Sequence, residues 1–447
     1  MTYLRLKKGH DIGIAGVPQK TYIEAGSVKS VALLPNEFLY VKPKLLVKEG
    51  DMVKCGDPLF IDKQNPNIKW ASPGGGIVSK IQFGPRRVVQ SIEITLDEDE
   101  SYAQYETISI ADSDRQKLID KILEMNLWPL IRQRPFNKIA DPKDTPKSIF
   151  VSACNTAPLA VDNNFILDGS DEAFNAGLAL LEKLTEGDVH LAIHEDANST
   201  SLTSNDNVRI HRINGPHPVG NVGVLIHHMD PLNPHEVVWT CEPQHVLTLG
   251  RAILTGKYDP AMTITIAGPS TENPGYIKTR TGAPVETLSQ GNIKEGNHRL
   301  IRGDVLTGKA ITNVPYLGLY DTSLSCIPES HERTFIGWLK PGSSKRIYSL
   351  MQTYFGSNSS QFSFSTLLQG GKRALIPFNA WEDVLPMDIL PNPLYRAILA
   401  QDIDEMEKLG ILEVVEEDVA LCSFACPSKI DLGGAIRQGL DQIVKED

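Results

Sequence analysis

The chain is organised around the stretch Gly215-Pro-His-Pro-Val-Gly-Asn-Val-Gly223. Short apolar runs lie on both sides of it, at residues 208–213 and 222–226, and we interpret each run as a strand. Two prolines and three glycines within nine residues predict a stiff loop with little side-chain bulk. Bare backbone at a strand end is where α/β sheets commonly bind ligands or partners, although the same composition also suits an ordinary tight connection.

Length and composition describe an ordinary globular protein with several domains. A chain of 447 residues predicts about three domains. Hydrophobic residues make up 41% and charged residues 22% of the chain, and the net charge of −11 argues against nucleic acid as a partner. No apolar run approaches the roughly 18 residues that a membrane span needs, and the sequence does not open with a signal peptide. We therefore expect a chain that resides in the cytoplasm.

Residues 1–100 have the pattern of a β domain, in which short apolar stretches alternate with Gly, Pro and Asp turns. The turns at 47–53 and 71–78 resemble those of biotinyl/lipoyl-type barrel-sandwich domains, which carry a swinging cofactor on a lysine. Lys63 lies near the place of that lysine, but residues 64–67 lengthen the hairpin. We therefore expect Lys63 to be an ordinary loop lysine, and a lipoyl or biotinyl group on it is the alternative.

The pattern changes to alternating helices and strands at residues 101–257. Helical spacing at 112–127 and 171–184 alternates with buried-type strands at 148–153 and 189–193. Short strand–helix–strand connections imply parallel pairing, so we predict a Rossmann-like α/β domain. No Gly-x-Gly-x-x-Gly fingerprint opens any of these helices, so the usual pyrophosphate loop is missing from the sequence.

Two further domains and a connecting segment complete the chain. Residues 258–335 are β-rich, and their turn at 278–284 resembles that of the β-grasp fold called soluble-ligand-binding. Residues 336–377 are predicted to be a connecting β segment. Residues 378–447 are predicted to form a helical C-terminal domain, with the last helix at 433–445.

The C-terminal domain contains part of a cluster-binding motif. Cys422-Ser-Phe-Ala-Cys426-Pro matches the end of the ferredoxin-type pattern C-x2-C-x2-C-x3-C-P. The spacing places the two missing ligands at Glu416 and Val419, so only two of four thiolates are present. We therefore predict a ferredoxin-type module without its cluster, and no metal at Cys422 and Cys426. The other four cysteines are isolated, which is typical of small buried side chains.

Motifs along essentially the whole chain resemble one family, the A subunit of the bacterial Na+-translocating NADH:quinone oxidoreductase. These motifs are Arg132-Gln-Arg-Pro-Phe136, Gly215–Asp230, Gly337-Trp338, Gly370–Arg373, Met387–Pro391 and Leu421–Pro427. The family is related to the C subunit of the Rnf complex and to the NADH-binding flavoprotein subunit of complex I, which carry a glycine-rich flavin loop. The corresponding stretch here is Leu130–Lys138, in which arginines, a proline and a phenylalanine replace glycine.

The resemblance implies a subunit of NADH:ubiquinone reductase (Na+-transporting), an enzyme of the translocase class. Such a subunit would lie peripherally on the cytoplasmic face of the bacterial inner membrane and support ubiquinone reduction coupled to Na+ export. It would contact the membrane only through the integral and peripheral subunits of its complex. It would hold no tightly bound cofactor of its own, because FMN, FAD and Fe–S groups belong to other subunits. The alternative is a flavin-binding NADH dehydrogenase, a diaphorase-like module.

Three residues of the replaced flavin loop, Arg132, Arg134 and Phe136, form a candidate quinone or interface patch. A quinone head group needs hydrogen-bond donors at its carbonyls and a flat apolar surface against its ring, and arginine beside phenylalanine supplies both. The alternative is that the two arginines form ordinary ion pairs. The sequence assigns no catalytic residue and no cofactor-binding residue.

The histidines near the Gly215–Gly223 loop do not predict a metal site. His217, His227, His228 and His235 are close in sequence. If the run at 222–226 continues as a strand, His227 and His228 point to opposite faces and cannot serve one site. We expect loop packing or an interface hydrogen bond instead.

Overall fold

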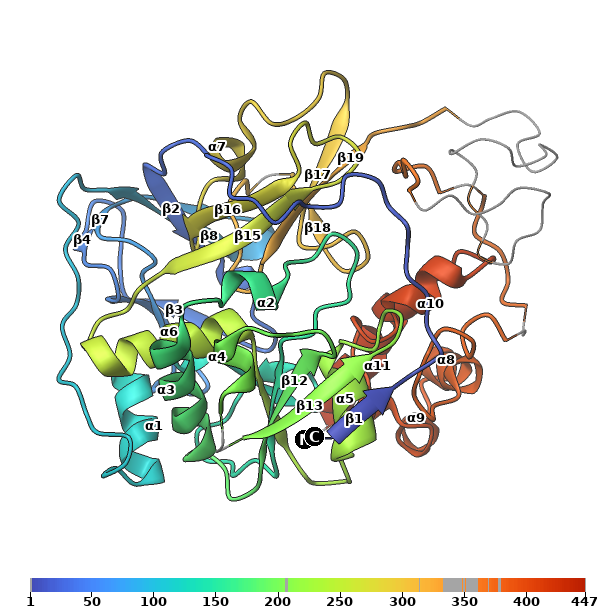
Figure 1. The fold of residues 1–447 in the computed structure, drawn as a ribbon, viewed down its shortest axis with the longest axis horizontal. Coiled ribbons are helices and arrows are strands. Elements are labelled where there is room, and N and C mark those ends of the chain that lie inside the picture. The colour runs from blue at the N-terminus through green and yellow to red at the C-terminus, as the bar shows by residue number, and fades with distance from the viewer. Residues whose placement is uncertain are drawn as a thin grey trace.

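The computed structural model describes residues 2–205, 208–312, 314–332, 348, 350, 361–368, 370–376 and 379–446. Within these ranges the strands form sheets of seven, five, four and three strands, and helices make up the C-terminal part of the chain (Figure 1). The protein is therefore a mixed α/β protein with several sheets, as the sequence predicts. No helix in the described ranges is long and apolar enough to cross a membrane.

Two small sheets pack together in the N-terminal domain. One has the order β2 (Ser30–Leu33), β8 (Val89–Leu96), β7 (Gly76–Phe83), β4 (Met52–Val53), and the other β3 (Pro43–Leu45), β5 (Pro58–Asp62), β6 (Lys69–Ala71). Their shared core is aromatic, with the ring centroids of Phe60 and Trp70 stacked 4.5 Å apart and Phe38 5.2 Å from Trp70. Lys63 is exposed in the connection from β5 to β6.

The largest sheet has the order β1-β13-β12-β11-β14-β9-β10. Its strands are β1 (Thr2–Arg5), β9 (Ile131–Arg134), β10 (Lys138–Ile139), β11 (Ile149–Ser152), β12 (Val189–His194), β13 (Arg209–Asn214) and β14 (Val238–Cys241). Strands β1, β13, β12, β11 and β14 pair in parallel, whereas β9 and β10 are antiparallel to their neighbours. The first strand of the chain is thus an edge of this sheet and lies outside the two small N-terminal sheets.

Helices of this α/β domain are α1 (Arg115–Glu124), α2 (Asn163–Ile166), α3 (Asp171–Glu182), α4 (Thr200–Thr203), α5 (Val222–Met229) and α6 (Pro243–Thr255). The predicted helices at 112–127 and 171–184 correspond to α1 and α3. Helices α3 and α6 approach closely because Gly177 and Gly250 lie between them. A Cβ atom at Gly250 would lie 1.8 Å from the carbonyl oxygen of Ala173, so only glycine fits there.

Residues 222–226 are helical, so the strand predicted there is wrong. They open α5, and the backbone of its N-cap residue Asn221 is extended, with φ −69° and ψ 137°. Leu225 and Ile226 pack in a core with sheet residues, whereas Val224 packs in the core of the C-terminal helices. Because α5 is buried on two sides, its sequence is apolar on two sides, and the helical period does not show.

The remaining domains are a β-rich unit and a helical bundle. The five-stranded sheet has the order β16 (Gly275–Arg280), β15 (Ala261–Ala267), β19 (Ser323–Pro328), β17 (His298–Arg302), β18 (Lys309–Ala310), and α7 (Val285–Ser289) follows β16 in the chain. The C-terminal helices are α8 (Pro391–Ala400), α9 (Ile403–Lys408), α10 (Ala420–Ala425) and α11 (Leu432–Glu446), the last close to its predicted range. The motif Gly337-Trp338 and much of the predicted connecting segment lie outside the described residues.

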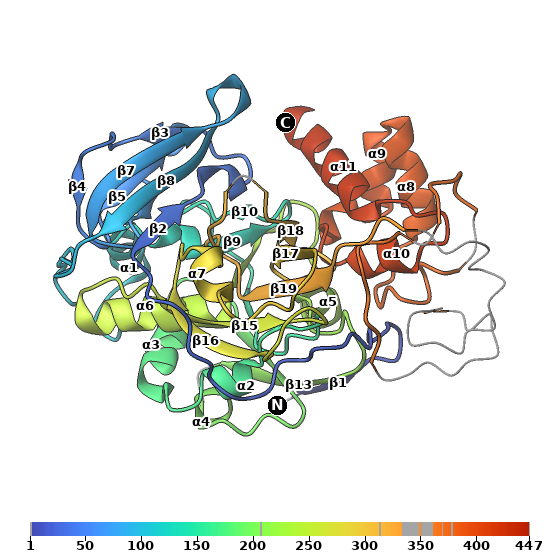
Figure 2. The same ribbon diagram turned by 90° about the horizontal axis from the view of Figure 1, so that it is seen from above.

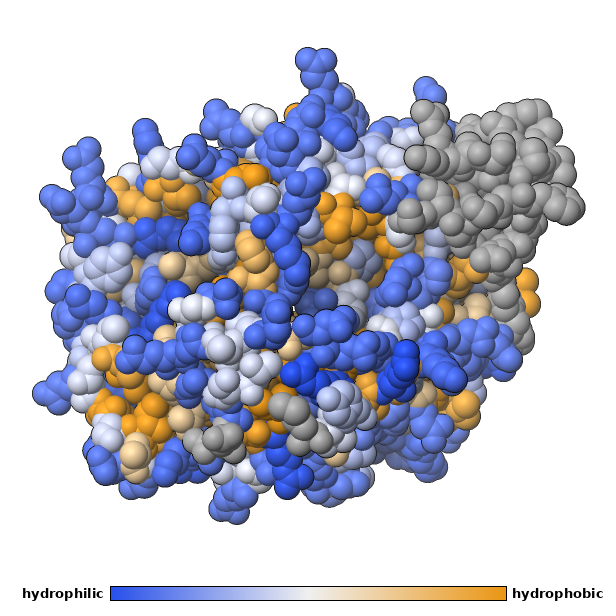
Figure 3. Space-filling model, in the orientation of Figure 1, coloured by the Kyte–Doolittle hydropathy of each residue, from blue (hydrophilic) through white to orange (hydrophobic). Residues whose placement is uncertain are grey.

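The face of the molecule seen in Figure 3 is mostly hydrophilic, with apolar side chains in patches, one of them over the N-terminal domain at the upper left. This distribution agrees with the net charge of −11. A turned view places the N-terminal domain and the C-terminal helices on either side of the α/β domain (Figure 2).

Candidate functional site

The loop that follows β13 is held by segments from several parts of the chain. The hydroxyl of Ser152 donates a 2.6 Å hydrogen bond to the carbonyl of Gly220, at the carboxyl end of β11. A Cβ atom at Gly220 would lie 1.8 Å from the carbonyl oxygen of Cys154, so the glycine allows this close approach. From the N-terminal segment, Asp11 accepts a 2.8 Å bond from the backbone N–H of His217. The loop is therefore a packed junction between segments.

His217, in the middle of this loop, is buried. Its side chain is 3% exposed, and its Nδ1 lies 3.2 Å from the hydroxyl of Thr156. Its Nε2 has no hydrogen-bond partner among the described residues. Burial lowers the pKa of His217, against the opposing effect of Asp304 and Asp11. The imidazole is therefore neutral near pH 7 and serves packing in this loop.

A buried ion pair joins the end of β9 to the C-terminal helices. Arg134 Nη1 lies 3.0 Å from Asp418 Oδ2, and Arg134 Nη2 lies 2.6 Å from Glu417 Oε1. The side chains of Arg134 and Asp418 are 3% and 0% exposed. Burial raises the pKa of Asp418 to about 6, although Arg134 acts in the opposite direction. The backbone N–H of Val415 donates a further 3.0 Å bond to Asp418.

Helix α5 completes this junction. The side-chain amide of Asn221 donates a 2.9 Å bond to the carbonyl of Glu417. A Cβ atom at Gly223 would lie 2.3 Å from Asp418 Oδ2, so the carboxylate lies directly against the first turn of the helix. Positive partial charge at a helix N-terminus stabilises a carboxylate in this position. We call Arg134, Asn221, Gly223, Glu417 and Asp418 the junction cluster.

Arg132 lies two residues before Arg134 on β9 and faces a different set of partners. Its Nη2 lies 2.5 Å from Glu242 Oε1, and its guanidinium carbon lies 4.8 Å from the ring centroid of Tyr320. Burial opposes the charge on Arg132, but the carboxylates of Glu242 and Glu417 outweigh it and raise the pKa of Arg132. Arg132 thus connects the start of α6 with the β-rich domain.

Phe136, the third candidate residue, is partly buried against the core of the C-terminal helices. Its backbone has a positive φ of 75°, which is rare for a bulky residue. Its carbonyl accepts a 3.1 Å bond from Arg437 on α11. The structure therefore brings Arg132, Arg134 and Phe136 into one interdomain region, and both arginines are engaged in ion pairs there.

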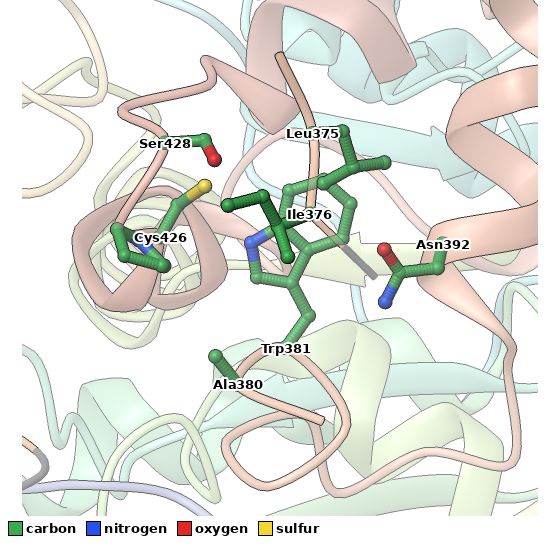
Figure 4. A pocket seen from close by; sticks show the side chains of 8 residues that line it. Leu375, Ile376, Ala380, Trp381, Asn392, Cys426 and Ser428 are labelled. Atoms are coloured by element: carbon green, nitrogen blue, oxygen red, sulfur yellow. The ribbon is translucent and has the colours of Figure 1, made fainter. Parts of the chain in front are cut away.

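The two cysteines of the partial cluster motif are buried in and after α10. Cys422 and Cys426 are each 1% exposed, and the thiol of Cys422 lies 3.7 Å from the carbonyl of Trp381. Burial raises the pKa of Cys422. Cys426 lines a small hollow that is partly open to solvent, and Trp381 lies between Cys426 and Asn392 there (Figure 4).

The two positions where the motif lacks ligands have other roles. Glu416 forms an ion pair with Arg437, at 2.6 and 2.5 Å, and Val419 is 2% exposed in the apolar core. Among the described residues there is no group of three or more His, Cys, Asp or Glu side chains placed to hold a metal ion.

The adjacent histidines of α5 bind the C-terminal domain. His227 Nδ1 lies 3.0 Å from Glu413 Oε2, and His228 Nε2 lies 2.7 Å from the carbonyl oxygen of Pro386. They follow one another on a helix and not on a strand, so they diverge by about 100°. The predicted interface hydrogen bonds are present. His235 lies apart from them, exposed in a turn.

The sequence did not single out Glu242, Glu417, Tyr320 or Arg437, which complete the region. The only local signal was the acidic run Glu416-Glu-Asp418, directly before the cysteine motif. Because a charge run is usually a solvated surface, it gave no reason to expect a buried Asp418.

Together these features define a multidomain α/β protein in which a buried ion pair, Arg134–Asp418, joins the α/β domain to the C-terminal helices. Three family models match it: the NqrA N-terminal barrel-sandwich hybrid domain at residues 4–97, the NqrA second alpha/beta domain at 113–258, and the NQRA C-terminal domain at 263–313. The chain is also 39% identical to the A subunit of the Na(+)-translocating NADH-quinone reductase of Pasteurella multocida, over 99% of this chain and 100% of that protein. The chain is 37% identical to the corresponding protein of Saccharophagus degradans, over 99% of this chain and 100% of that protein. The chain belongs to this family, the A subunit of Na+-translocating NADH-quinone reductase.

Membership in this family confirms the resemblance found in the sequence and the barrel-sandwich N-terminal domain. The chain is accordingly one component of an oxidoreductase complex that uses NADH and quinone and translocates sodium. The names of the relatives give no support to the alternative of a diaphorase-like module. A solved NAD+-reducing nickel–iron hydrogenase in its H2-reduced state is 8% identical, with a TM-score of 0.37 over 75% of this chain and 64% of that one.

Proposed function

We propose that this chain is a peripheral subunit on the cytoplasmic face of the bacterial inner membrane, docked on the integral subunits of its complex. In this role it supports ubiquinone reduction coupled to Na+ export. FMN, FAD and Fe–S groups in other subunits carry the electrons, and this chain holds no tightly bound cofactor. The observation that carries the proposal is that the residues at its cofactor-like positions are engaged in ion pairs and apolar packing.

Each such position supports this view separately. In place of a glycine-rich flavin loop, β9 supplies Arg132 and Arg134, and both guanidinium groups are paired with carboxylates. In place of two cluster ligands, Glu416 pairs with Arg437 and Val419 is buried in an apolar core. Among these contacts the ion pairs of Arg134 join the α/β domain to the C-terminal helices, and a fixed arrangement of domains suits a docking subunit.

The candidate patch of Arg132, Arg134 and Phe136 contributes to quinone reduction as a contact for quinone or for a neighbouring subunit. Arg132 is the member best placed for this, because its partner Glu242 is 38% exposed. Its guanidinium already lies over an aromatic ring, that of Tyr320. Arg134 and Phe136 hold the loop in place from its buried side.

The finer fold assignments belong to the same proposal. Parallel strands joined through helices support a Rossmann-like domain at 101–257. A five-stranded sheet with α7 supports a β-grasp domain at 258–335. Helices around Cys422 and Cys426 support a ferredoxin-type module without its cluster at 378–447.

Replacement of Arg132 tests the patch. In the assembled complex, Arg132→Gln should raise the apparent KM for ubiquinone while NADH oxidation with an artificial acceptor is unchanged. Arg251→Gln is the matched control, because Arg251, on α6 and away from β9, forms a 3.0 Å ion pair with Asp259. Unchanged quinone kinetics in an assembled Arg132→Gln complex would eliminate the quinone contact. Failure of that variant alone to assemble would assign the patch to subunit docking.

A further inference from the structure

The turn between β7 and β8 forms a basic and apolar tip on an acidic chain. The tip consists of residues 83–88. Phe83 and Val88 are 47% and 51% exposed, and Arg86 and Arg87 between them are exposed as well. Figure 2 shows this turn projecting at the top of the view, clear of the other domains. The tip carries two positive charges, whereas the chain as a whole has a net charge of −11.

The backbone of the tip is a closed turn with two residues of positive φ. Arg86 and Arg87 have φ values of 56° and 59°, in the left-handed region that side chains other than glycine rarely adopt. The turn is closed by hydrogen bonds from the N–H of Gly84 to the carbonyl of Val88, at 2.8 Å, and from the N–H of Arg87 to the carbonyl of Gly84, at 3.1 Å. Neither arginine has an ion-pair partner within the part of the chain that the structure describes. Two unpaired positive charges are thus presented on a closed turn.

The arginines and the apolar side chains form one surface. The guanidinium carbon of Arg87 lies 5.9 Å from the ring centroid of Phe83, and Pro85 is exposed beside them. Aromatic rings next to basic groups suit the boundary between water and lipid, where the ring enters the apolar region and the cation meets phosphate. A surface made only for solubility would not need exposed phenylalanine and valine in a projecting turn.

We propose that the tip at residues 83–88 inserts into the headgroup layer of an anionic phospholipid bilayer. The proposal rests on the proposed function, because that places the chain beside the membrane of its complex. Phe83 and Val88 would lose water contact there, and Arg86 and Arg87 would bind lipid phosphates. The acidic body of the chain is repelled by the same lipids, but salt screens this repulsion over about 8 Å. A projecting tip therefore reaches the lipids while the body stays outside. This contact adds to the attachment through partner subunits.

A fluorophore at the tip tests the proposal. The six native cysteines are all buried, so a thiol-reactive, environment-sensitive fluorophore will label the folded subunit selectively at position 85 of a Pro85→Cys variant. The labelled subunit is assembled into the complex and reconstituted in vesicles of phosphatidylethanolamine and phosphatidylglycerol. We expect strong quenching by doxyl-labelled lipid. A label in the Glu186→Cys variant, in the turn after α3 and away from the tip, should not be quenched.

The possible outcomes distinguish a failure of lipid insertion at the tip from a failure of the proposed function. An assembled complex that retains NADH:quinone activity but shows no doxyl quenching at position 85 would overturn lipid insertion and leave the proposed function standing. A blue-shifted emission without doxyl quenching would also overturn it, and would place the tip against a protein partner. Loss of the subunit from the membrane complex altogether would count against the proposed function instead.

Removal of the two positive charges of the tip gives a second, independent test of lipid insertion. Each basic residue near an anionic membrane surface contributes about 1 kcal/mol, so Arg86→Gln with Arg87→Gln should lower the ratio of inserted to free tip about 30-fold. The matched control is Arg209→Gln with Arg251→Gln, which removes the same charge elsewhere on the surface. Equal loss of quenching in both double variants would overturn the role of the two tip arginines.

Discussion

Arg134 is the residue on which the junction between domains depends most. Its guanidinium and the carboxylate of Asp418 are nearly inaccessible to solvent, at 3% and 0% exposure. Removing one partner of a buried ion pair leaves an unpaired buried charge, which costs about 3–5 kcal/mol. Arg134→Gln should therefore lower the free energy of unfolding of the purified subunit by about that amount. Urea denaturation followed by intrinsic fluorescence measures it.

Two further variants make this measurement decisive. Replacing both buried charges together, with Arg134→Met and Asp418→Leu, should recover most of the lost free energy, because the one charge then left without its partner, that of Glu417, is 32% exposed. Arg251→Gln breaks a partly exposed pair with Asp259 and should cost about 0–1 kcal/mol. A loss for Arg134→Gln no larger than that for Arg251→Gln would contradict the structural role of the buried pair.

A buried histidine pair makes stability depend on pH. His190 Nδ1 lies 2.9 Å from His211 Nε2, and the rings are stacked at 8°. Burial, with repulsion from His190, lowers the pKa of His211 to about 4. The unfolded chain binds a proton near pH 6.5, whereas the folded chain does not, so stability is present above pH 6.5 and is lost as the pH falls toward 4. The loss from this one group is on the order of 3 kcal/mol.

The His211→Gln variant isolates that contribution. Other buried histidines also have a lowered pKa, among them His217 and His245, so wild type and variant should both lose stability in acid. Thermal unfolding at pH 7 and at pH 4.5 should show a smaller fall for the variant. Equal falls in both proteins would mean that His211 does not stay neutral in the folded state.

At this scale the sequence indicates which residues matter but not which residues they contact. Arg132 and Arg134 stood out because they occupy the place of a flavin loop. Their carboxylate partners follow 110 residues later for Arg132, and 283 and 284 residues later for Arg134. A single sequence contains no local pattern that links positions so far apart. The partners in these ion pairs could therefore be identified only from the structure.

Helix α5 is the element that joins the sheet to the C-terminal helices, and Gly223 makes the contact possible. Gly→Ala within a helix normally stabilises it by about 1 kcal/mol. Here the added Cβ would lie 2.3 Å from Asp418 Oδ2. Asp418 cannot yield freely, because Arg134 and the N–H of Val415 hold it. Gly223→Ala should therefore destabilise the protein by about 1–3 kcal/mol, measured by urea denaturation.

Gly371→Ala is the control, since a Cβ atom at Gly371 meets nothing within 4 Å. It should leave the free energy of unfolding nearly unchanged. A Gly223→Ala variant as stable as wild type would show that the contact between α5 and Asp418 is looser than the structure gives.

The elements that the sequence predicts well are those with one buried face. Helices α1 and α3 have a clear apolar stripe, and both were expected near their observed ranges. The prediction of a strand at residues 222–226 was wrong because α5 is covered on one side by the sheet and on the other by C-terminal helices. A run that is apolar all round fits a buried strand and a buried helix equally.

In the whole molecule, one apolar core joins the N-terminal and α/β domains, and charged residues of the C-terminal part add further connections. Arg437 on α11 binds Glu416, the carbonyl of Phe136 and the hydroxyl of Tyr40 from the N-terminal domain. The kind of secondary structure in each part of the chain could be predicted from turns and periodicity. The pairing of β1 with β13 could not, because four residues at the start of a chain carry no information about a partner strand some 200 residues away.

The central claim is that this chain supports quinone reduction without carrying electrons itself. The most direct test compares the purified complex with and without this chain, assaying NADH oxidation by an artificial acceptor and ubiquinone reduction separately. We expect loss of the chain to abolish ubiquinone reduction, to spare NADH oxidation, and to be reversed by adding back the colourless purified protein. Loss of NADH oxidation together with quinone reduction, restored only by a preparation of the chain that carries a coloured cofactor, would contradict the claim.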